Sequence, residues 1–327
     1  MTAKPRLDEF ERIARFFAPL AAPGGLRLLD DAALIPGAKG EEYVLKTDAI
    51  VAGVHFRQDD PPGEIAQKLL RVNLSDLAAK GAVPVGYLLV TCLPPDCGEA
   101  WIEAFAKGLA ADQKRFGIKL YGGDSTATPG PATLSVAAFG KVKRGRAILR
   151  AGAKPGDLVY VSGTLGDAAL GLAALKGALT GLAPVARDFL IRRYRLPEPR
   201  LDLGRALAGL AHAAADISDG LVADLGHICT ASKLGAVIEA KLLPLSKAAR
   251  EAIRAEPERI FAALCFGDDY ELVFAAPARA AKRIAALSRK LGLPLTPIGR
   301  FEKGAGVRVL DAAGKPAALP QAGYRHF

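Results

Sequence analysis

Aspartates recur along this chain where a strand, a helix or a glycine turn would hold them in place. They stand at Asp30, Asp31, Asp48, Asp76, Asp124, Asp216, Asp219, Asp268 and Asp269. Hard cations such as Mg²⁺ take carboxylate oxygens as ligands and commonly bridge them to substrate phosphates. A single aspartate more often serves in a turn or a helix cap, so the metal interpretation depends on the whole set.

Two of these aspartates fall inside predicted elements. Alternation along a strand predicted at 43–51 places Val44, Lys46 and Asp48 on one face, where a half-buried carboxylate needs a partner. Asp76 lies in a helix that begins at Pro61-Pro62 and stops at Gly81, one turn after Asn73. Asp76 is either an ordinary polar helix position or a metal ligand.

Three short motifs combine acids with glycine. YGGDST (121–126) turns on two glycines, which lets backbone N–H groups approach an anion. DISDGL (216–221) places Ser218 or Asp219 at a helix N-terminus, where either caps the helix and where the dipole also favours a phosphate. GDDYEL (267–272) crowds three acids at a strand start, which is costly unless they are solvated or paired with cations.

Several other chemistries lack their motifs. The chain has no GxxxxGK[ST] loop, no GxGxxG that opens a helix, no HExxH and no GxSxG. Its four cysteines form no CxxC pair, which fits a reducing compartment. The first residues lack the apolar core of a signal peptide, and no apolar run approaches the ~20 residues of a membrane span. We therefore expect a cytoplasmic protein without a membrane partner. Among the histidines, His55 alone follows a strand that ends in an acidic site.

The charge balance favours anionic partners without identifying them. Lys and Arg number 44 against 34 Asp and Glu, a net charge of +10, which suits nucleotides, phosphate esters or nucleic acid, or reflects composition bias alone. The basic stretches KVKRGR (141–146) and IRRYR (191–195) are interpreted as solvated faces, because aromatic residues make up only 6% and no aromatic-interleaved module is present. No nucleic-acid partner is expected.

The length of 327 residues predicts two domains. Strands are predicted at 43–51, 86–93, 118–123 and 133–142, with helices at 62–80 and 101–116, which completes an α+β block near residue 150. RAGAKPGD (150–157) is the best linker candidate, because glycine and proline cluster there. A second α+β block follows, with a helix predicted at 218–232 and strands near Ile298 and Val307.

Eight motifs, taken in order, resemble the thiamine-monophosphate kinase family across nearly the whole chain. They are DDAALI (30–35), KTDAIVAGVHF (46–56), VNLSDLAAKGAVP (72–84), YGGDST, RAGAKPGD, DISDGL, GDDYEL and GYRHF (323–327). That family belongs to the ATP-binding superfamily of aminoimidazole ribonucleotide synthetase and selenophosphate synthetase.

The resemblance implies an α+β fold like that of aminoimidazole ribonucleotide synthetase. An N-terminal domain (1–149) would pair its sheet across a homodimer to form a β-barrel, and a C-terminal α/β sandwich (150–327) would complete a cleft for ATP. The implied reaction transfers the γ-phosphoryl group of ATP directly to thiamine monophosphate, with several Mg²⁺ ions. Since the acceptor phosphate is itself a nucleophile, no phosphoenzyme and no protein base are expected.

The resemblance also assigns residues. It implies that thiamine monophosphate is contacted by His55, Asp268 and Tyr324. It also implies that ATP is contacted by Gly123, Asp124, Arg150 and Ser218. Asp48, Asp124 and Asp219 are the expected catalytic residues. The magnesium ligands that it implies are Asp31, Thr47, Asp48, Asp76, Asp124, Asp216 and Asp219.

The chain departs from the family pattern at a few positions. Leu29 stands where the family has the glycine of GDD, Ala52 replaces a glutamate, and Phe266-Gly267-Asp268-Asp269 replaces GGED. Lys46 is unusual beside the metal-binding segment.

Two alternative functions stay open. One is another ATP-using superfamily member, although the reactive cysteines of selenophosphate synthetase and of the hydrogenase maturation dehydratase are missing. The other is a non-catalytic nucleotide- or nucleic-acid-binding protein.

Overall fold

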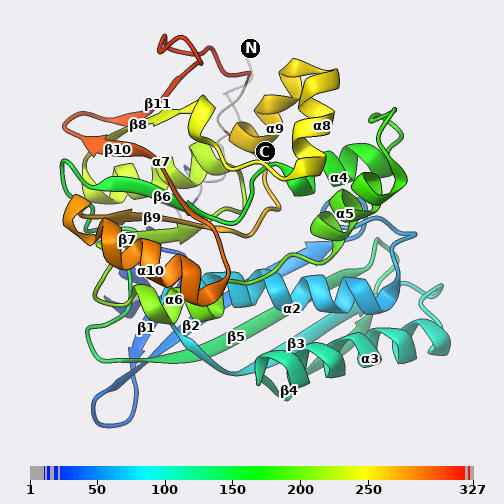
Figure 1. The fold of residues 1–327 in the computed structure, drawn as a ribbon. Helices are drawn as coiled ribbons and strands as arrows, with labels where there is room; N and C mark the ends of the chain where they lie inside the picture. Colours follow the sequence, from blue (N-terminus) through cyan, green and yellow to red (C-terminus); the bar gives the residue numbers. More distant parts are fainter. Residues whose placement is uncertain (1–10, 12, 15–17, 21–22, 321–322, 325–327) are drawn as a thin grey trace, which may run out of the picture.

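Two β-sheets, joined by a segment without helix or strand, organise the chain (Figure 1). The computed structural model describes residues 11, 13–14, 18–20, 23–320 and 323–324. The N-terminal sheet has the strand order β1-β2-β5-β3-β4, and the C-terminal sheet has the order β11-β8-β10-β6-β9-β7. Residues 144–157 connect β5 to β6, and we propose to divide the domains within this segment.

Within the described part of the chain, helices cover one face of the N-terminal sheet and leave the other open. Its strands are β1 (Ala33–Pro36), β2 (Glu41–Val51), β3 (Val83–Leu93), β4 (Lys119–Ala127) and β5 (Thr133–Lys143). Helices α2 (Pro62–Ala79) and α3 (Glu99–Phe116) pack together over one face, around buried residues such as Leu69, Phe105 and Val136. The opposite face exposes Leu45, Leu88 and Val90.

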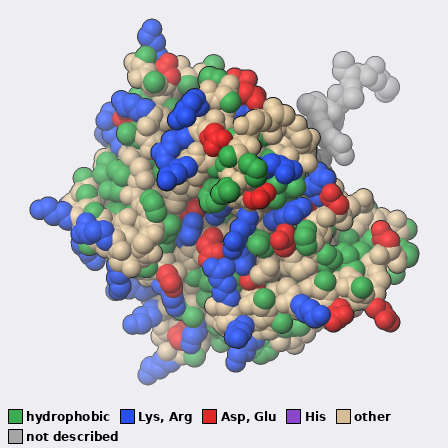
Figure 2. Space-filling model, turned by 45° about the vertical axis from the view of Figure 1, so that its right-hand side comes forward, with side chains coloured by type: hydrophobic (Ala, Val, Ile, Leu, Met, Phe, Trp, Pro, Cys, Tyr) green, Lys and Arg blue, Asp and Glu red, His purple; other side chains and the backbone are tan. Residues whose placement is uncertain are grey.

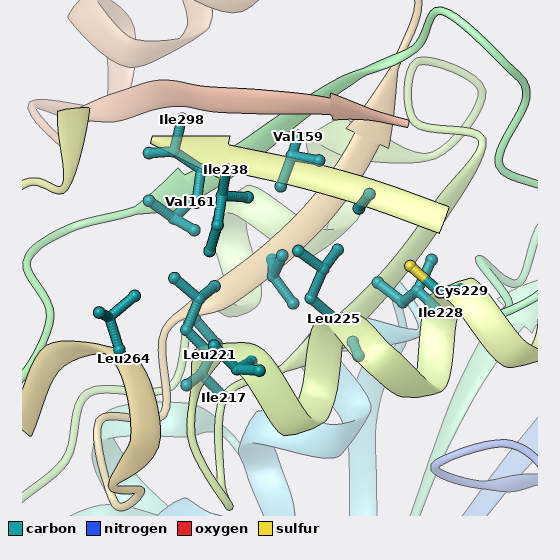
Figure 3. Packing of buried hydrophobic residues seen from close by; sticks show 14 of the residues in the cluster. Val159, Val161, Ile217, Leu221, Leu225, Ile228, Cys229, Ile238, Leu264 and Ile298 are labelled. Atoms are coloured by element: carbon teal, nitrogen blue, oxygen red, sulfur yellow. The ribbon is translucent and has the colours of Figure 1, made fainter. Parts of the chain in front are cut away.

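The C-terminal sheet is buried on both faces. Its strands are β6 (Leu158–Ser162), β7 (Ala213–Asp216), β8 (Gly235–Glu239), β9 (Leu272–Ala276), β10 (Leu295–Glu302) and β11 (Gly306–Leu310). Figure 3 shows Leu221 and Leu225 of α7 (Leu221–Ser232) facing Val159 and Val161. The alternate side chains of β6 and β9 pack with α6 (Leu201–Leu207) and α10 (Ala281–Leu291) on the other face. The remaining α-helices are α4 (Asp167–Leu175), α5 (Pro184–Arg195), α8 (Lys247–Ala255) and α9 (Ile260–Cys265).

Helix α2 runs between the two sheets and contacts both halves of the chain (Figure 1). Close approach on its two sides depends on glycine. A Cβ at Gly108 of α3 would lie 2.2 Å from the Gly63 carbonyl oxygen, and one at Gly204 of α6 would lie 1.9 Å from the Ala78 carbonyl oxygen. At these contacts the backbones of α3 and α6 touch the backbone of α2, so α2 is buried along most of its length.

Most predicted elements are present, with three differences. The turn predicted at the glycines of YGGDST does not form, because both glycines lie within strand β4, which continues through Lys119–Ala127. Residues 33–36, where no strand is predicted, form β1 and pair with β2. The helix predicted at 218–232 begins at Leu221 instead. Among the described residues, no helix combines the length and apolar character that a bilayer crossing requires.

The contact between α6 and α2 leads to a first prediction. Gly204→Ala should lower the free energy of unfolding by about 1–3 kcal/mol, because its methyl group has no room against the Ala78 carbonyl. Gly226→Ala, in open space within α7, is the matched control and should gain about 0.4–1 kcal/mol. Urea unfolding followed by circular dichroism measures both. Equal midpoints for the two variants would contradict the close packing.

Candidate active site

A cavity of about 480 Å³ opens between the two halves of the chain. Most of the predicted site residues line this cavity, although they come from distant parts of the sequence. They are Asp48, His55, Asp76, Arg150, Asp216, Ser218, Asp219, Asp268 and Tyr324. An apolar wall is formed by side chains of α4 and of neighbouring segments, namely Ala168, Ala169, Leu170, Leu172, Ala173, Ile50, Val54 and Phe266. On the face shown in Figure 2, acidic, basic and hydrophobic side chains lie interspersed.

Three buried carboxylates meet behind this cavity. Asp31 precedes β1, Asp76 belongs to α2 and Asp216 ends β7, and oxygens of all three lie within 4.8 Å of one another. Burial and the nearby Asp31 raise the pKa of Asp216 to about 6. Burial likewise raises the pKa of Asp76 well above its usual range, against the attraction of Lys46. One oxygen of Asp216 is buried without a hydrogen-bond partner among the described residues.

Three cations partly compensate these acids. The Lys80 Nζ lies 2.5 Å from both Asp30 Oδ1 and Asp31 Oδ2, and the Arg150 guanidinium pairs with Asp31. Although burial opposes ionisation, Lys80 and Arg150 hold the pKa of Asp31 well below its usual range. The third cation is the ammonium of Lys46, which pairs with Asp48 and Asp76.

We call Asp30, Asp31, Asp48, Asp76 and Asp216 the acidic cluster. Fully ionised, these five carboxylates exceed their three cations by two negative charges. Together with the unpartnered oxygen of Asp216, this excess fits Mg²⁺, which binds through one or two protein carboxylates and substrate phosphates. Asp31, Asp48, Asp76 and Asp216 are therefore suitable ligands.

Two of the predicted motifs, 216–221 and 267–272, interlock at the cavity. The Asp268 amide donates to the Ser218 carbonyl at 2.9 Å, and the Tyr270 amide donates to the Ile217 carbonyl at 2.9 Å. A Cβ at Gly267 would lie 1.7 Å from the Ser218 oxygen, so glycine is needed there. Asp268 adopts a left-handed φ of 69° and accepts a bond from Lys68 Nζ at 3.1 Å. These bonds fix the direction of the Asp268 carboxylate.

The loop before α7 is held differently from the prediction. Neither Ser218 nor Asp219 caps this helix, whose N-cap is Gly220. Instead, one carboxylate oxygen of Asp224 accepts the backbone N–H groups of Ser218, Asp219 and Gly220, at 3.0, 3.0 and 3.2 Å. The predicted cap is wrong because a downstream side chain from the first turn reaches back over the loop.

His55 and Tyr324 lie on the rim of the cavity. The His55 Nδ1 accepts the Val51 amide at 3.1 Å, so a neutral His55 carries its proton on Nε2. The Tyr324 amide donates to the Asp219 carbonyl at 3.0 Å, which anchors the end of the chain beside the loop before α7. Residues 325–327 of the predicted GYRHF motif lie outside the described residues.

Three predicted site residues, Thr47, Gly123 and Asp124, do not line the cavity of a single chain. Strand pairing places Asp48, Val136, Leu89 and Gly123 in one row across β2, β5, β3 and β4. Three strand spacings of ~4.8 Å put Gly123 roughly 14 Å from Asp48. Alternation turns Asp124 and Thr47 to the opposite, exposed face.

Sequence reasoning missed several buried charges around the cavity. Lys68, on α2, also lies 3.8 Å from the centre of the Tyr194 ring. Glu271 is buried between Arg193 and Arg200, with Arg193 Nη2 at 3.0 Å from Oε1. IRRYR is therefore not a solvated face as predicted, since Tyr194 is buried and Arg193 binds Glu271. In the sequence, Lys68 and Arg71 stand among apolar residues of the same helix, and this pattern could have indicated that both charges are buried.

Comparison with known proteins places the chain in a class. The AIR synthase related protein N-terminal domain matches residues 29–142, and the corresponding C-terminal domain matches residues 154–312. The chain is thus an AIR synthase related protein with two domains of mixed α+β structure.

Individual relatives narrow this class. The chain is 44% identical to the thiamine-monophosphate kinase of Caulobacter vibrioides over 304 residues, which cover 91% of this chain and 85% of the relative. It is 41% identical to that of Escherichia coli strain K12 over 323 residues, covering 98% of each. The solved structure of AaThiL complexed with AMPPCP and TMP aligns with a TM-score of 0.86 and 32% identity, covering 99% of both chains. The chain belongs to the thiamine-monophosphate kinase family, as the motifs predicted.

The pairing of Lys80 yields a second prediction. Lys80→Met should lower the free energy of unfolding of the metal-free protein by about 3–5 kcal/mol, because it leaves Asp30 and Asp31 buried without their shared cation. Urea unfolding at pH 7 measures the loss. Below about pH 4 the difference should narrow, since protonation of Asp31 removes the stabilisation that its lowered pKa gives wild type. A loss below ~1 kcal/mol at pH 7 would contradict the role of Lys80.

Proposed function

We propose that this chain transfers the γ-phosphoryl group of ATP to the phosphate of thiamine monophosphate, with magnesium. The observation that carries the proposal is the acidic cluster, which opens into the cavity with an excess of negative charge and an unpartnered oxygen of Asp216. The family relationship and the complex of AaThiL with AMPPCP and TMP support the same donor and acceptor.

Both reactants are anionic, so the protein must bring negative charges together in line. Magnesium, when bound, would supply positive charge between them, and Asp31, Asp48, Asp76, Asp216 and Asp219 would hold it. A P-loop lysine is not needed in such an arrangement. Because the acceptor phosphate is already a nucleophile, no side chain has to remove a proton.

The remaining cavity residues would orient the two substrates. Arg150 can bind two phosphate oxygens with its planar guanidinium, whose Nε has no partner among the described residues. Ser218 also lines the cavity and would contact ATP. His55, Asp268 and Tyr324 would contact thiamine monophosphate, whose cationic thiazolium suits the Asp268 carboxylate. The apolar wall from α4 would exclude water from the transfer.

Asp124 and Gly123 require a second copy of the chain. Within one chain, β4 is an edge strand whose residues are all exposed, and its Asp124 points away from the acidic cluster. The same sheet face exposes Leu45, Leu88 and Val90. We infer a homodimer in which this face is covered by a second copy and the two sheets form a barrel. Thr47 and Asp124 would then meet the ATP of the partner.

Other aspects of the proposal follow from the family. We assign residues 1–149 to nucleotide binding and dimerisation, and residues 150–327 to completing the cleft. The working location is the cytoplasm, where ATP and magnesium are supplied. No role in nucleic-acid binding is assigned.

A phosphorus NMR assay tests the reaction. Wild type with ATP, Mg²⁺ and thiamine monophosphate should produce thiamine diphosphate and ADP in equal amounts. Asp76→Asn should lower turnover by ~100-fold or more, because it removes a buried ligand of the charge-stabilising ions. The control Asp202→Asn changes an exposed aspartate outside the cavity and should match wild type. ATP consumption only with a different acceptor, or none at all, would refute the proposed activity.

Mixing variants tests the shared site. Asp124→Asn and Asp76→Asn proteins should each be nearly inactive, but a subunit-exchanged mixture should recover about a quarter of wild-type turnover. Half of its dimers are mixed, and each of these has one site with both aspartates. No recovery after demonstrated subunit exchange would place Asp124 outside the partner's site.

A further inference from the structure

The ammonium of Lys46 lies within the acidic cluster, at a place where a metal ion would be expected. Its Nζ is 3.2 Å from Asp48 Oδ1 and also 3.2 Å from Asp76 Oδ2. These two carboxylates come from different elements, β2 and α2, and Lys46 shares its strand face with Asp48. The lysine side chain is only 20% exposed, so it is part of the packed site rather than a mobile surface group.

The position of Nζ excludes a metal ion from the same space. An Mg²⁺ ion that bridged Asp48 and Asp76 would need each oxygen at about 2.0–2.1 Å, in the region that Nζ now occupies. The lysine also stays charged there. Carboxylate oxygens of Asp48 and Asp76, each 3.2 Å from Nζ, favour the ammonium form.

We propose that Lys46 is a built-in monovalent cation that replaces one divalent ion between Asp48 and Asp76. This inference rests on the proposed function, because it concerns the metal ions that accompany the nucleotide. Other ions still have ligands available, since Asp31, Asp76 and Asp216 lie together and one buried oxygen of Asp216 has no hydrogen-bond partner among the described residues.

The consequence is a difference in the number of ions bound. With Lys46 present, the fully ionised acidic cluster has an excess of two negative charges. A neutral residue at position 46 raises that excess to three and frees the space between Asp48 and Asp76. A divalent ion should then enter, drawn by two carboxylates that no longer have a cation.

Counting bound Mn²⁺ tests this inference without relying on turnover. Free Mn²⁺ is measured by electron paramagnetic resonance in the presence of a saturating non-hydrolysable ATP analogue. Lys46→Ser should bind one more Mn²⁺ per chain than wild type. The control Lys141→Ser removes a lysine of the same sheet that pairs with Glu41 outside the cavity, and it should bind the wild-type number.

Thermal unfolding gives a second readout. Without metal, Lys46→Ser and the length-preserving Lys46→Met should both melt below wild type, because the acidic cluster has lost a cation. Added Mn²⁺ should raise the melting temperature of Lys46→Ser more than that of wild type. If Lys46→Ser does not fold, Lys46→Ala, which also frees the space between Asp48 and Asp76, replaces it in both measurements.

The outcomes separate this inference from the proposed function. Equal Mn²⁺ counts and equal Mn²⁺-induced shifts in wild type and Lys46→Ser would overturn the role of Lys46 while leaving the kinase proposal intact. Absence of any Mn²⁺ or nucleotide binding in wild type would overturn both.

Discussion

The burial of charged side chains along α2 is the constraint on which the rest of the structure depends. Lys68, Arg71, Asp76 and Lys80 all lie on or directly after this helix and are almost fully buried. An ion that loses water without gaining a partner costs several kcal/mol, so each one requires an opposite charge from another element. Their partners come from four places in the chain, namely Asp268, Asp112, Lys46 and the Asp30-Asp31 pair. Among these pairs, Lys68–Asp268 joins the two halves of the chain across the cavity, and Arg71 adds a bond to the Pro197 carbonyl at 3.2 Å.

Buried acids with compensating partners also hold the C-terminal side of the cavity in place. Glu271 is buried and still ionised, because Arg193 and Arg200 lower its pKa against the effect of burial. Two residues earlier, Asp269 accepts the Gly166 and Ala168 amides at the start of α4, while burial and Asp167 raise its pKa to about 8. These buried anchors alternate with Asp268 and Tyr270, whose φ angles are left-handed. The left-handed backbone at these two cavity-lining positions is thus held by the hydrogen bonds of the Asp269 carboxylate and by the ion pairs of Glu271.

Local patterns in the sequence predicted what depends on local geometry. Alternation along 43–51 placed Lys46 and Asp48 on one face, and proline and glycine marked the ends of α2 nearly to the residue. The same alternation also separates Thr47 from Asp48, although the family resemblance grouped them. Local patterns could not predict contacts between residues that are far apart in the sequence. The bond from Asp224 back to residues 218–220, the burial of IRRYR and the short strand β1 all depend on neighbours that only the folded chain supplies.

The carboxylate of Asp224 has a consequence for what the cleft can recognise. Three backbone N–H groups that point into the loop before α7 are already satisfied by this built-in anion, so a phosphate group has no vacant amide nest to enter there. A nucleotide that arrives without its counter-ions meets fixed negative charge from Asp219 and the acidic cluster, and gains little from the main chain. Because bonds within the chain hold this loop, arranging it for a ligand costs less entropy. Under the proposed function, such a cleft would select the metal–nucleotide complex over the free nucleotide, so nucleotide recognition would depend on the supply of divalent ions.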